Sequence, residues 1–294
     1  MQTTTKAELP VTLAVIGSVN LDLVARAPRL PVPGETVTGA TFASYPGGKG
    51  ANQALAARRL GASVRLVARV GQDAHAAPAL ELLRVDGVDL SAIAIDDSAP
   101  TGVALIAVDD LAENHIVVAP GANARLMPAD IPAGALDGPV LCQLEVPVST
   151  LEQVAAQARS FLALNLAPAR EVPVSLLERA DLLVVNEGEA AFYGESLHAA
   201  RGWVAITFGG TGATLLRRGI EVARAAPPPI TPVDTTGAGD AFTAALVVAL
   251  LEHQPPLAAL RFACAAGAAA ATRAGAQPAL PMRAEVLALL ESCT

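Results

Sequence analysis

Lysine and cysteine are scarce in this sequence, and its charge balance is acidic. Only Lys6 and Lys49 are lysines among 294 residues, and the formal net charge is −8 at pH 7. An acidic surface repels phosphate backbones, so we expect no nucleic-acid partner. The three cysteines lie far apart and are odd in number, which gives no disulfide framework and is typical of a protein of the reducing cytoplasm.

Paired histidines and long apolar spans are also missing. None of the four histidines has another histidine four residues away, so a zinc site is not expected. The apolar run at 11–16 is too short for a signal peptide or a membrane span. The longer stretch at 257–272 contains Arg261 and indicates a buried helix. We therefore expect no membrane partner.

Strand-like and helix-like segments alternate along most of the chain. This pattern is typical of a mostly parallel sheet covered by helices on both faces. We expect one α/β domain spanning residues 1–294. Buried strands are predicted at 13–16, 64–70, 140–144, 161–164, 182–185 and 203–206, and helices at 50–60, 76–85, 150–159, 238–252, 257–272 and 283–291.

Two regions break this alternation. Residues 35–43 and 90–118 look like short strands with no helix between them, and 101–108 with 115–118 resembles a hairpin. Strands that project from a parallel sheet suggest a small β flap, which near a site acts as a lid that excludes water. We place the lid strands at about 22–45 and 95–120.

The most informative motif is Asp234-Thr-Thr-Gly-Ala-Gly-Asp240, which directly precedes an apolar helix. Free backbone N–H groups and the helix dipole favour an anion at such a helix start. A carboxylate beside an anion site suits proton abstraction coupled to phosphoryl transfer. Ordinary capping and turn formation explain the same residues equally well.

Two further glycine-containing motifs follow or precede predicted elements. Asn20 and Asp22 follow the first strand. There they could bind a polyhydroxyl ligand, since the carboxylate accepts hydrogen bonds from neighbouring hydroxyls, or they could form a plain turn. The Rossmann fingerprint is absent there, which argues against NAD. Gly47-Gly-Lys-Gly-Ala-Asn52 lacks the P-loop spacing, so Lys49 and Asn52 are either polar arms toward a ligand or part of a glycine-rich helix start.

Two motifs at strand ends also allow two interpretations. Asn186 and Glu189 could hold Mg²⁺ through waters, or they could form a capping box at a helix start. The glycine turn at 206–212 could admit a nucleotide or could be a simple hairpin turn.

Taken together, the motifs resemble the PfkB family of carbohydrate kinases, and within it the ribokinase branch. The resemblance covers residues 13–290. It implies a ribokinase-like three-layer α/β/α sandwich with a mostly parallel central sheet and a small β-sheet lid. The matching segments are Gly17–Asp22, Pro33–Gly39, Gly47–Gln53, Thr101–Ala104, Gly121–Asn123, Asn165–Ala169, Asn186–Glu189, Asp234–Asp240 and Gly275–Pro278.

The resemblance also implies an ATP-dependent sugar kinase that phosphorylates O5 of D-ribose, with Asp240 as the general base. The anion hole would be Gly237, Ala238 and Gly239. The sugar would be held by Asn20, Asp22, Gly48, Lys49, Gly50, Asn52, Glu145 and Asp240. ATP would be held by Asn186, Thr207, Gly209, Gly210, Gly212, Gly239 and Cys264, and its Mg²⁺ by Asn186 and Glu189.

The family resemblance implies a K⁺ activator and a homodimer through the lid. The K⁺ ligands would be Asp234, Thr236, Ala270, Arg273, Gly275 and Ala279. A serine is common at the last of these positions, so Ala279 removes one hydroxyl ligand. The segments at 150–165 and 186–203 are short for the family. The acceptor stays open between ribose, deoxyribose, a keto sugar and a nucleoside, and a non-catalytic sugar-binding regulator is the alternative class.

Overall fold

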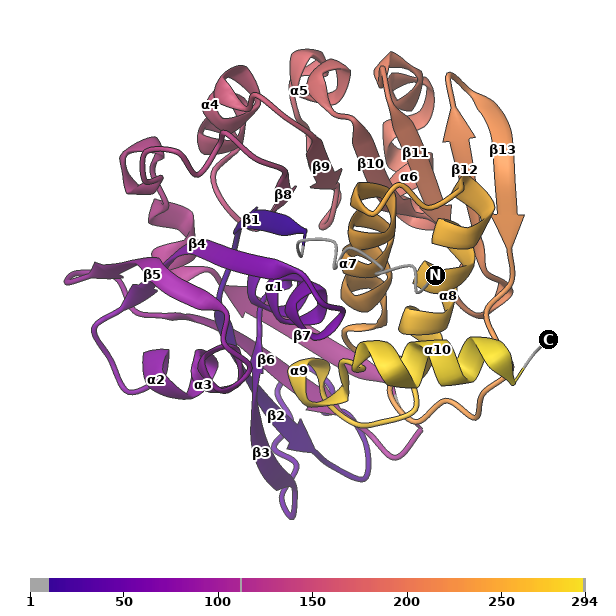
Figure 1. Ribbon diagram of the computed structural model, residues 1–294. Helices are drawn as coiled ribbons and strands as arrows, with labels where there is room; N and C mark the ends of the chain where they lie inside the picture. The colour runs from indigo at the N-terminus through magenta and orange to yellow at the C-terminus, as the bar shows by residue number, and fades with distance from the viewer. Residues whose placement is uncertain (1–10, 112, 293–294) are drawn as a thin grey trace, which may run out of the picture.

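The computed structural model describes residues 11–292 apart from residue 112, so the ends of the predicted 1–294 domain lie outside the described residues. The described chain forms a nine-stranded and a four-stranded sheet (Figure 1). The order in the large sheet is β13-β12-β11-β10-β9-β8-β1-β4-β5. Its strands are β1 (Thr12–Ile16), β4 (Ser63–Gly71), β5 (Asp89–Asp96), β8 (Val140–Gln143), β9 (Leu162–Asn165), β10 (Leu182–Asn186), β11 (Trp203–Thr207), β12 (Ala213–Arg217) and β13 (Ile220–Ala225).

All strand pairs of the large sheet between β5 at one edge and β11 are parallel. Strand β12 is antiparallel to both of its neighbours, β11 and β13. Apolar side chains fill both faces and form two separate core clusters. One face packs against α1 (Lys49–Arg59), α7 (Ala238–Leu251), α8 (Pro256–Ala270) and α10 (Arg283–Glu291), and the other against α4 (Val148–Gln157), α5 (Val174–Arg179) and α6 (Glu187–Tyr193). The predicted three-layer α/β/α arrangement is confirmed.

The small sheet lies at one side of this sandwich, at the bottom of Figure 1. Its order is β3-β2-β6-β7, with β2 parallel to β6 and the outer pairs antiparallel. The strands are β2 (Asn20–Arg26), β3 (Thr41–Gly47), β6 (Gly102–Val108) and β7 (Asn114–Ala119). Because β2 starts just after β1 ends, the small sheet begins at the carboxyl edge of the large one. A lid sheet is therefore present, as predicted.

Several predicted boundaries are wrong. The strand expected at 35–43 is β3 at Thr41–Gly47, and β5 pairs with β4 in the large sheet and does not belong to the lid. The helix expected at 76–85 is two short helices, α2 (Ala76–Ala79) and α3 (Glu81–Val85), joined at Leu80. The helix expected at 150–159 starts earlier, at Val148, directly after Pro147. Strand β2 falls in the lid range predicted at about 22–45 but starts earlier, at Asn20, and the hairpin β12–β13 was not expected.

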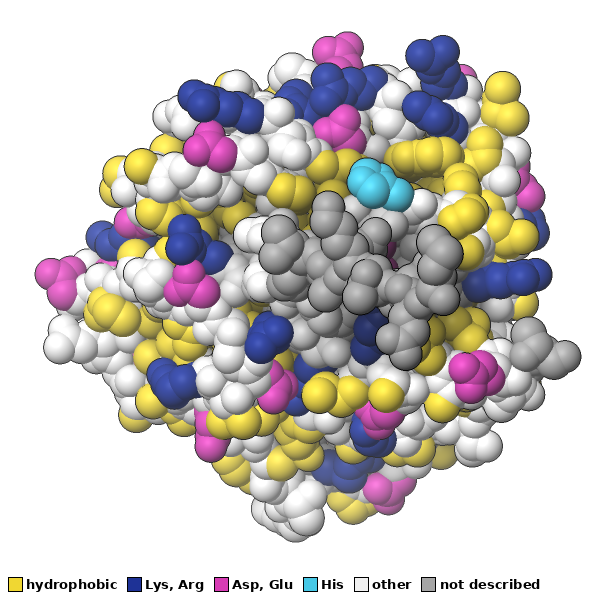
Figure 2. All heavy atoms as spheres, in the orientation of Figure 1, with side chains coloured by type: hydrophobic (Ala, Val, Ile, Leu, Met, Phe, Trp, Pro, Cys, Tyr) yellow, Lys and Arg dark blue, Asp and Glu magenta, His cyan; other side chains and the backbone are white. Residues whose placement is uncertain are grey.

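The distribution of charged side chains and the state of the cysteines can be compared with the sequence. Basic and acidic side chains are interspersed over the face shown in Figure 2. Cys142 and Cys264, the cysteines within the described chain, are buried and unpaired. Across the described residues, the helices are too short or too polar to cross a membrane.

Candidate active site

Asp240 lies in the first turn of α7, at the carboxyl edge of the large sheet. The helix begins after Gly237, which adopts the left-handed conformation at φ 79°. Glycine has no Cβ and adopts this conformation at little cost, so the backbone can turn sharply into the helix. A cavity of about 210 Å³ here is lined by Asp240 and by Asn165, Asn186 and Thr207, the last residues of β9, β10 and β11. The α7 start thus faces the strand ends, where α/β sheets bind ligands.

A second cavity of about 610 Å³ shares Asn186, Thr207 and Gly239 with the first. Pro227, Pro228, Phe242 and several small residues form most of its wall. All the residues predicted to bind ATP line this cavity: Asn186, Thr207, Gly209, Gly210, Gly212, Gly239 and Cys264. The glycine turn at 209–212 is the hairpin turn between β11 and β12, and its glycines line this cavity.

The Asp240 carboxylate is buried and held by two neighbouring amides of α1. Asn52 donates through Nδ2 to Oδ2 at 2.8 Å, and Gln53 donates through Nε2 to Oδ1 at 2.9 Å. Burial raises the pKa of Asp240, although the charge of Lys49 and both amide bonds lower it. A carboxyl group with a raised pKa is a stronger base than an exposed one, which suits proton abstraction.

Asp22 and Lys49 bring further charge to Asp240. Burial, together with the charges of Glu145 and Asp240, raises the pKa of Asp22 to about 7. Burial lowers the pKa of Lys49, but the carboxylates of Asp240, Glu145 and Glu189 outweigh it and leave that pKa raised. Lys49 is therefore the cation among several crowded carboxyl groups.

Of the predicted sugar-binding residues, only Lys49 and Asp240 line the smaller cavity. The Asp22 side chain, on β2, lies against Gly47 just before the start of α1, because a Cβ added at Gly47 would collide with the Asp22 carboxylate. Asn20, next to it on β2, accepts a hydrogen bond from Asn123 Nδ2 at 2.7 Å. Both side chains are buried at the junction between the lid and the large sheet.

Glu145 has a local role in this structure. The N-cap of α1, Gly48, has no side chain to satisfy the first N–H groups of the helix. Glu145 Oε2 accepts from the Lys49 N–H at 3.0 Å and from the Ser18 hydroxyl, which in turn accepts from the Gly50 N–H at 3.2 Å. Glu145 and Ser18 thus cap the helix that carries Lys49, Asn52 and Gln53.

Asn186 and Glu189 form a capping box at the start of α6. The Glu189 N–H donates to Asn186 Oδ1, and the Asn186 N–H donates to Glu189 Oε2, both at 2.8 Å. The capping interpretation is therefore correct. Both side chains also line the smaller cavity, and Glu189 Oε1 has no hydrogen bond among the contacts of the described residues. The oxygen donors fit Mg²⁺ held through water.

Asp234 connects two loops behind the α7 start. Its Oδ1 accepts from the Thr236 N–H and hydroxyl at 2.9 and 2.6 Å, and its Oδ2 accepts from the Gly275 N–H at 2.9 Å. Burial raises the pKa of Asp234, but these bonds outweigh it and lower that pKa. Three of the predicted K⁺ ligands are thus brought together.

The remaining predicted K⁺ ligands fit less well. Ala270 and Arg273 lie in the turn that ends α8. Ala279 has no side-chain oxygen, and its carbonyl accepts from Arg273 Nη2 at 3.2 Å. A carbonyl oxygen that faces a guanidinium is a poor cation ligand, so the set fits K⁺ without Ala279.

Five residues at this site had no assigned role from the sequence: Ser18, Gln53, Asn123, Gln143 and Asn165. Gln53, Asn123 and Asn165 stand in matching motifs, which marks the segments but not the function of each side chain. Gln143 ends an apolar strand, where an amide gives no pattern of its own. Ser18 stands in a matching motif too, Gly17–Asp22, two residues after the end of the first strand.

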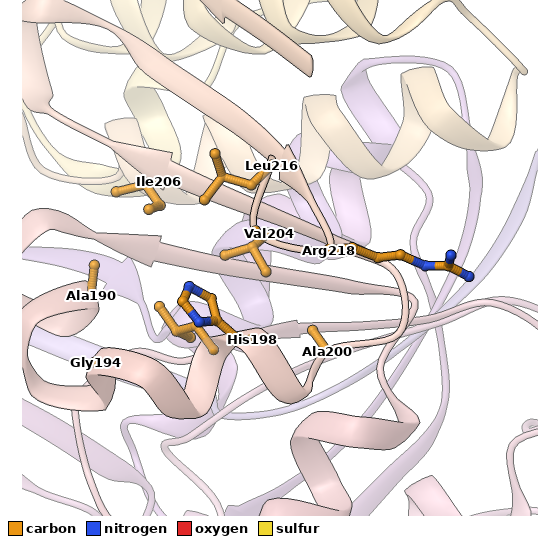
Figure 3. A pocket seen from close by; sticks show the side chains of 10 residues that line it. Ala190, Gly194, His198, Ala200, Val204, Ile206, Leu216 and Arg218 are labelled. Atoms are coloured by element: carbon orange, nitrogen blue, oxygen red, sulfur yellow. The ribbon is translucent and has the colours of Figure 1, made fainter. Parts of the chain in front are cut away.

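A hollow of about 150 Å³ lies away from these residues, between the turn at 194–199 and strands β11 and β12 (Figure 3). Val204, Ile206 and Leu216 form its floor, and His198 lies beside them. It contains no predicted site residue.

Comparisons with known proteins agree with this arrangement. Residues 12–283 match the family profile described as pfkB family carbohydrate kinase. The chain is 39% identical to the ribokinase of Bacillus subtilis over 292 residues, which cover 95% of this chain and 99% of that protein.

Solved structures give the same result. A ribokinase from Thermotoga maritima superposes with a TM-score of 0.87 at 32% identity, covering 96% of this chain and 99% of that one. The Arabidopsis thaliana ribokinase complexed with ribose and ATP gives the same TM-score, identity and coverage. With the family profile matched over nearly the whole described chain and the fold shared, the chain belongs to the PfkB family of carbohydrate kinases.

Proposed function

We propose that the chain transfers the γ-phosphoryl group of ATP to O5 of D-ribose, giving D-ribose 5-phosphate and ADP. One observation carries the proposal: the buried Asp240 lines the polar cavity at the strand ends, and its neighbour Gly239 lines both that cavity and the 610 Å³ one. The sugar is supported by the relatives, which are ribokinases, and one of these was solved with ribose and ATP.

In this proposal Asp240 takes the proton of the sugar hydroxyl as its oxygen attacks the γ-phosphorus. The bond from that phosphorus to the bridging oxygen breaks, and ADP leaves. The N–H groups of Gly237 and Gly239 stabilise the charge on the transferring group, aided by the α7 dipole. The Ala238 N–H, also predicted for the anion hole, donates instead to the Thr235 carbonyl at 3.1 Å. A positioned base contributes about 10²–10⁴-fold to such a rate.

Metal ions assist without changing this scheme. Asn186 and Glu189 would hold Mg²⁺ through water, and the ion would neutralise charge on the ATP phosphates. Asp234, Thr236 and Gly275 would position a K⁺ behind the anion hole.

The unpaired cysteines support a location in the cytoplasm.

A panel of acceptors tests the substrate. D-ribose, 2-deoxyribose, D-fructose and adenosine are compared by kcat/KM at fixed ATP and Mg²⁺, with ADP release as the readout. We expect D-ribose to be preferred. A higher kcat/KM for another acceptor would support a kinase but contradict D-ribose as its substrate. Saturable ribose binding with no ADP release would favour a regulatory protein.

We also propose that the lid forms a homodimer. Leu105 and Val117 pair across β6 and β7, and both are exposed, as is Phe42 on β3. On the opposite face Ile116 and Val118 are exposed too. Because isolated large side chains are ordinary on surfaces but grouped ones indicate a contact, a second lid is the partner that this sheet fits.

A further inference from the structure

A chain of buried amides connects Asp240 to the large sheet. Gln53 donates through Nε2 to two acceptors, Asp240 Oδ1 and Asn165 Oδ1, each at 2.9 Å. Its Oε1 accepts from Gln143 Nε2 at 2.7 Å. Gln53 and Gln143 are both 0% exposed, so water does not compete for these bonds.

We infer that Gln53 and Gln143 are positioning residues for the phosphoryl transfer, which hold the Asp240 carboxylate in one orientation. This inference rests on the proposed role of Asp240 as the base. Neither glutamine lines the predicted ligand cavities, so they act through the side chains that Gln53 holds there, Asp240 and Asn165.

The orientation of the Gln53 amide follows from its neighbours. Asn165 donates through Nδ2 to the Val184 carbonyl at 3.1 Å, so its Oδ1 is left to accept from Gln53. Gln143 supplies a donor on the other side, so the oxygen of Gln53 must face β8. A flipped Gln53 would set its oxygen against the Asp240 carboxylate and lose all three bonds.

The anchors of this chain are rigid. Gln143 ends β8, Asn165 ends β9 and Val184 lies in β10, three adjacent parallel strands. Asn52 holds the second carboxylate oxygen of Asp240 from the same helix as Gln53. Both oxygens are therefore fixed by neutral amides, which donate without adding a charge.

Charged groups also act on Asp240 and must be distinguished from the amides. Lys49 on α1 favours the ionised form of Asp240, while Glu145 disfavours it. Asp22 on β2 and Glu189 on α6 couple to Asp240 as well. None of these side chains changes when Gln53 or Gln143 is replaced, so a difference between variants reports the amide.

The test replaces Gln53 with methionine, which has a similar volume but no donor. Without the donor the pKa of Asp240 rises further, so the acidic limb of the kcat/KM profile should move up by about one pH unit. We expect kcat at pH 7 to fall about tenfold or more while the ribose KM stays within about twofold. A folded Gln53→Met enzyme with the wild-type limb and kcat would overturn the inference.

A second variant covers the case in which Gln53→Met does not fold. Gln143→Met leaves Gln53 in place but removes the bond that fixes its flip, so we expect a smaller shift of the limb in the same direction. An unchanged limb in Gln143→Met would contradict the role of that residue.

Thr150→Val serves as the control for the loss of a buried hydrogen bond. The Thr150 hydroxyl donates to the Leu126 carbonyl at 2.8 Å on the other face of the sheet. This variant should lose stability but keep the pH profile. Asp240→Asn separates the two proposals: if it is inactive while Gln53→Met behaves as wild type, only the positioning inference fails; if it stays active, the base assignment itself fails.

Discussion

Asp22 is buried among carboxyl groups, and this placement costs stability at neutral pH. Its pKa of about 7 in the folded chain lies above the ordinary value of 3.8. The folded state therefore holds a proton that the unfolded state has lost, so stability falls as pH rises from about 3.8 to 7 and then stays level. Such strain is typical of a residue kept for binding.

We expect Asp22→Asn to be more stable than the wild type at pH 8 and to bind ribose less well. The amide removes the buried charge and its repulsion with Glu145 and Asp240. A gain of about 1 kcal/mol corresponds to a rise in Tm of roughly 2–4 °C. Tm at pH 5 and pH 8, together with the ribose KM, checks this. An equal Tm difference at both pH values would show that the charge is not the cause.

At the residue scale, the sequence located the charged groups but not the two buried glutamines that connect Asp240 to the sheet. Asp240, Lys49 and Asp22 stand in glycine-rich motifs that are recognisable by spacing. Gln53 lies 187 positions from Asp240 in the sequence, and 90 positions from Gln143, and it is hydrogen-bonded to both. A pairing over such separations has no local pattern, because it depends on how three strands and two helices pack.

Among the elements, the buried strands and long helices were predictable because apolar runs identify them. Of the lid strands, β6 and β7 lie within one residue of the predicted hairpin strands at 101–108 and 115–118, but β2 and β3 were not well bounded. Strand β2 carries polar residues toward the site, so its apolar pattern is weak. The hairpin β12–β13 was missed because charged residues interrupt its apolar pattern. Arg217 ends β12, and Glu221 and Arg224 lie in β13, which is the exposed edge strand of the sheet. Exposed strands lack the apolar contrast on which periodicity depends.

The segments at 234–240 and 270–279 are joined by the hydrogen bond from the Gly275 N–H to Asp234 Oδ2, so a change in one should act on the proposed K⁺ site between them. We expect Ala279→Ser to strengthen activation by K⁺, because it adds a hydroxyl ligand behind the anion hole. The measurement is the K⁺ concentration for half-maximal activation in both proteins, with Na⁺ as the control ion. Identical K⁺ curves for the two would argue against a cation site at this position.

For the whole molecule, the exposed lid face predicts the oligomeric state. Leu105→Asp with Val117→Asp should convert a dimer to a monomer, because two charges would be buried against a second lid. Sedimentation velocity at several protein concentrations checks this. Ile220→Asp is the matched control. Ile220 is also exposed but lies on β13, the edge strand of the large sheet outside the lid, so this change should leave the mass of the oligomer unchanged. A monomeric wild type would rule out the lid dimer.

We propose that a buried carboxylate at the start of α7 drives transfer from ATP to ribose. The decisive measurement is the rate of ADP formation with D-ribose and Mg²⁺ for the wild type and for Asp240→Asn. We expect ribose-dependent ADP release by the wild type, and turnover at least about 10²-fold slower in a variant that still binds ribose. Near-wild-type turnover by Asp240→Asn would contradict it.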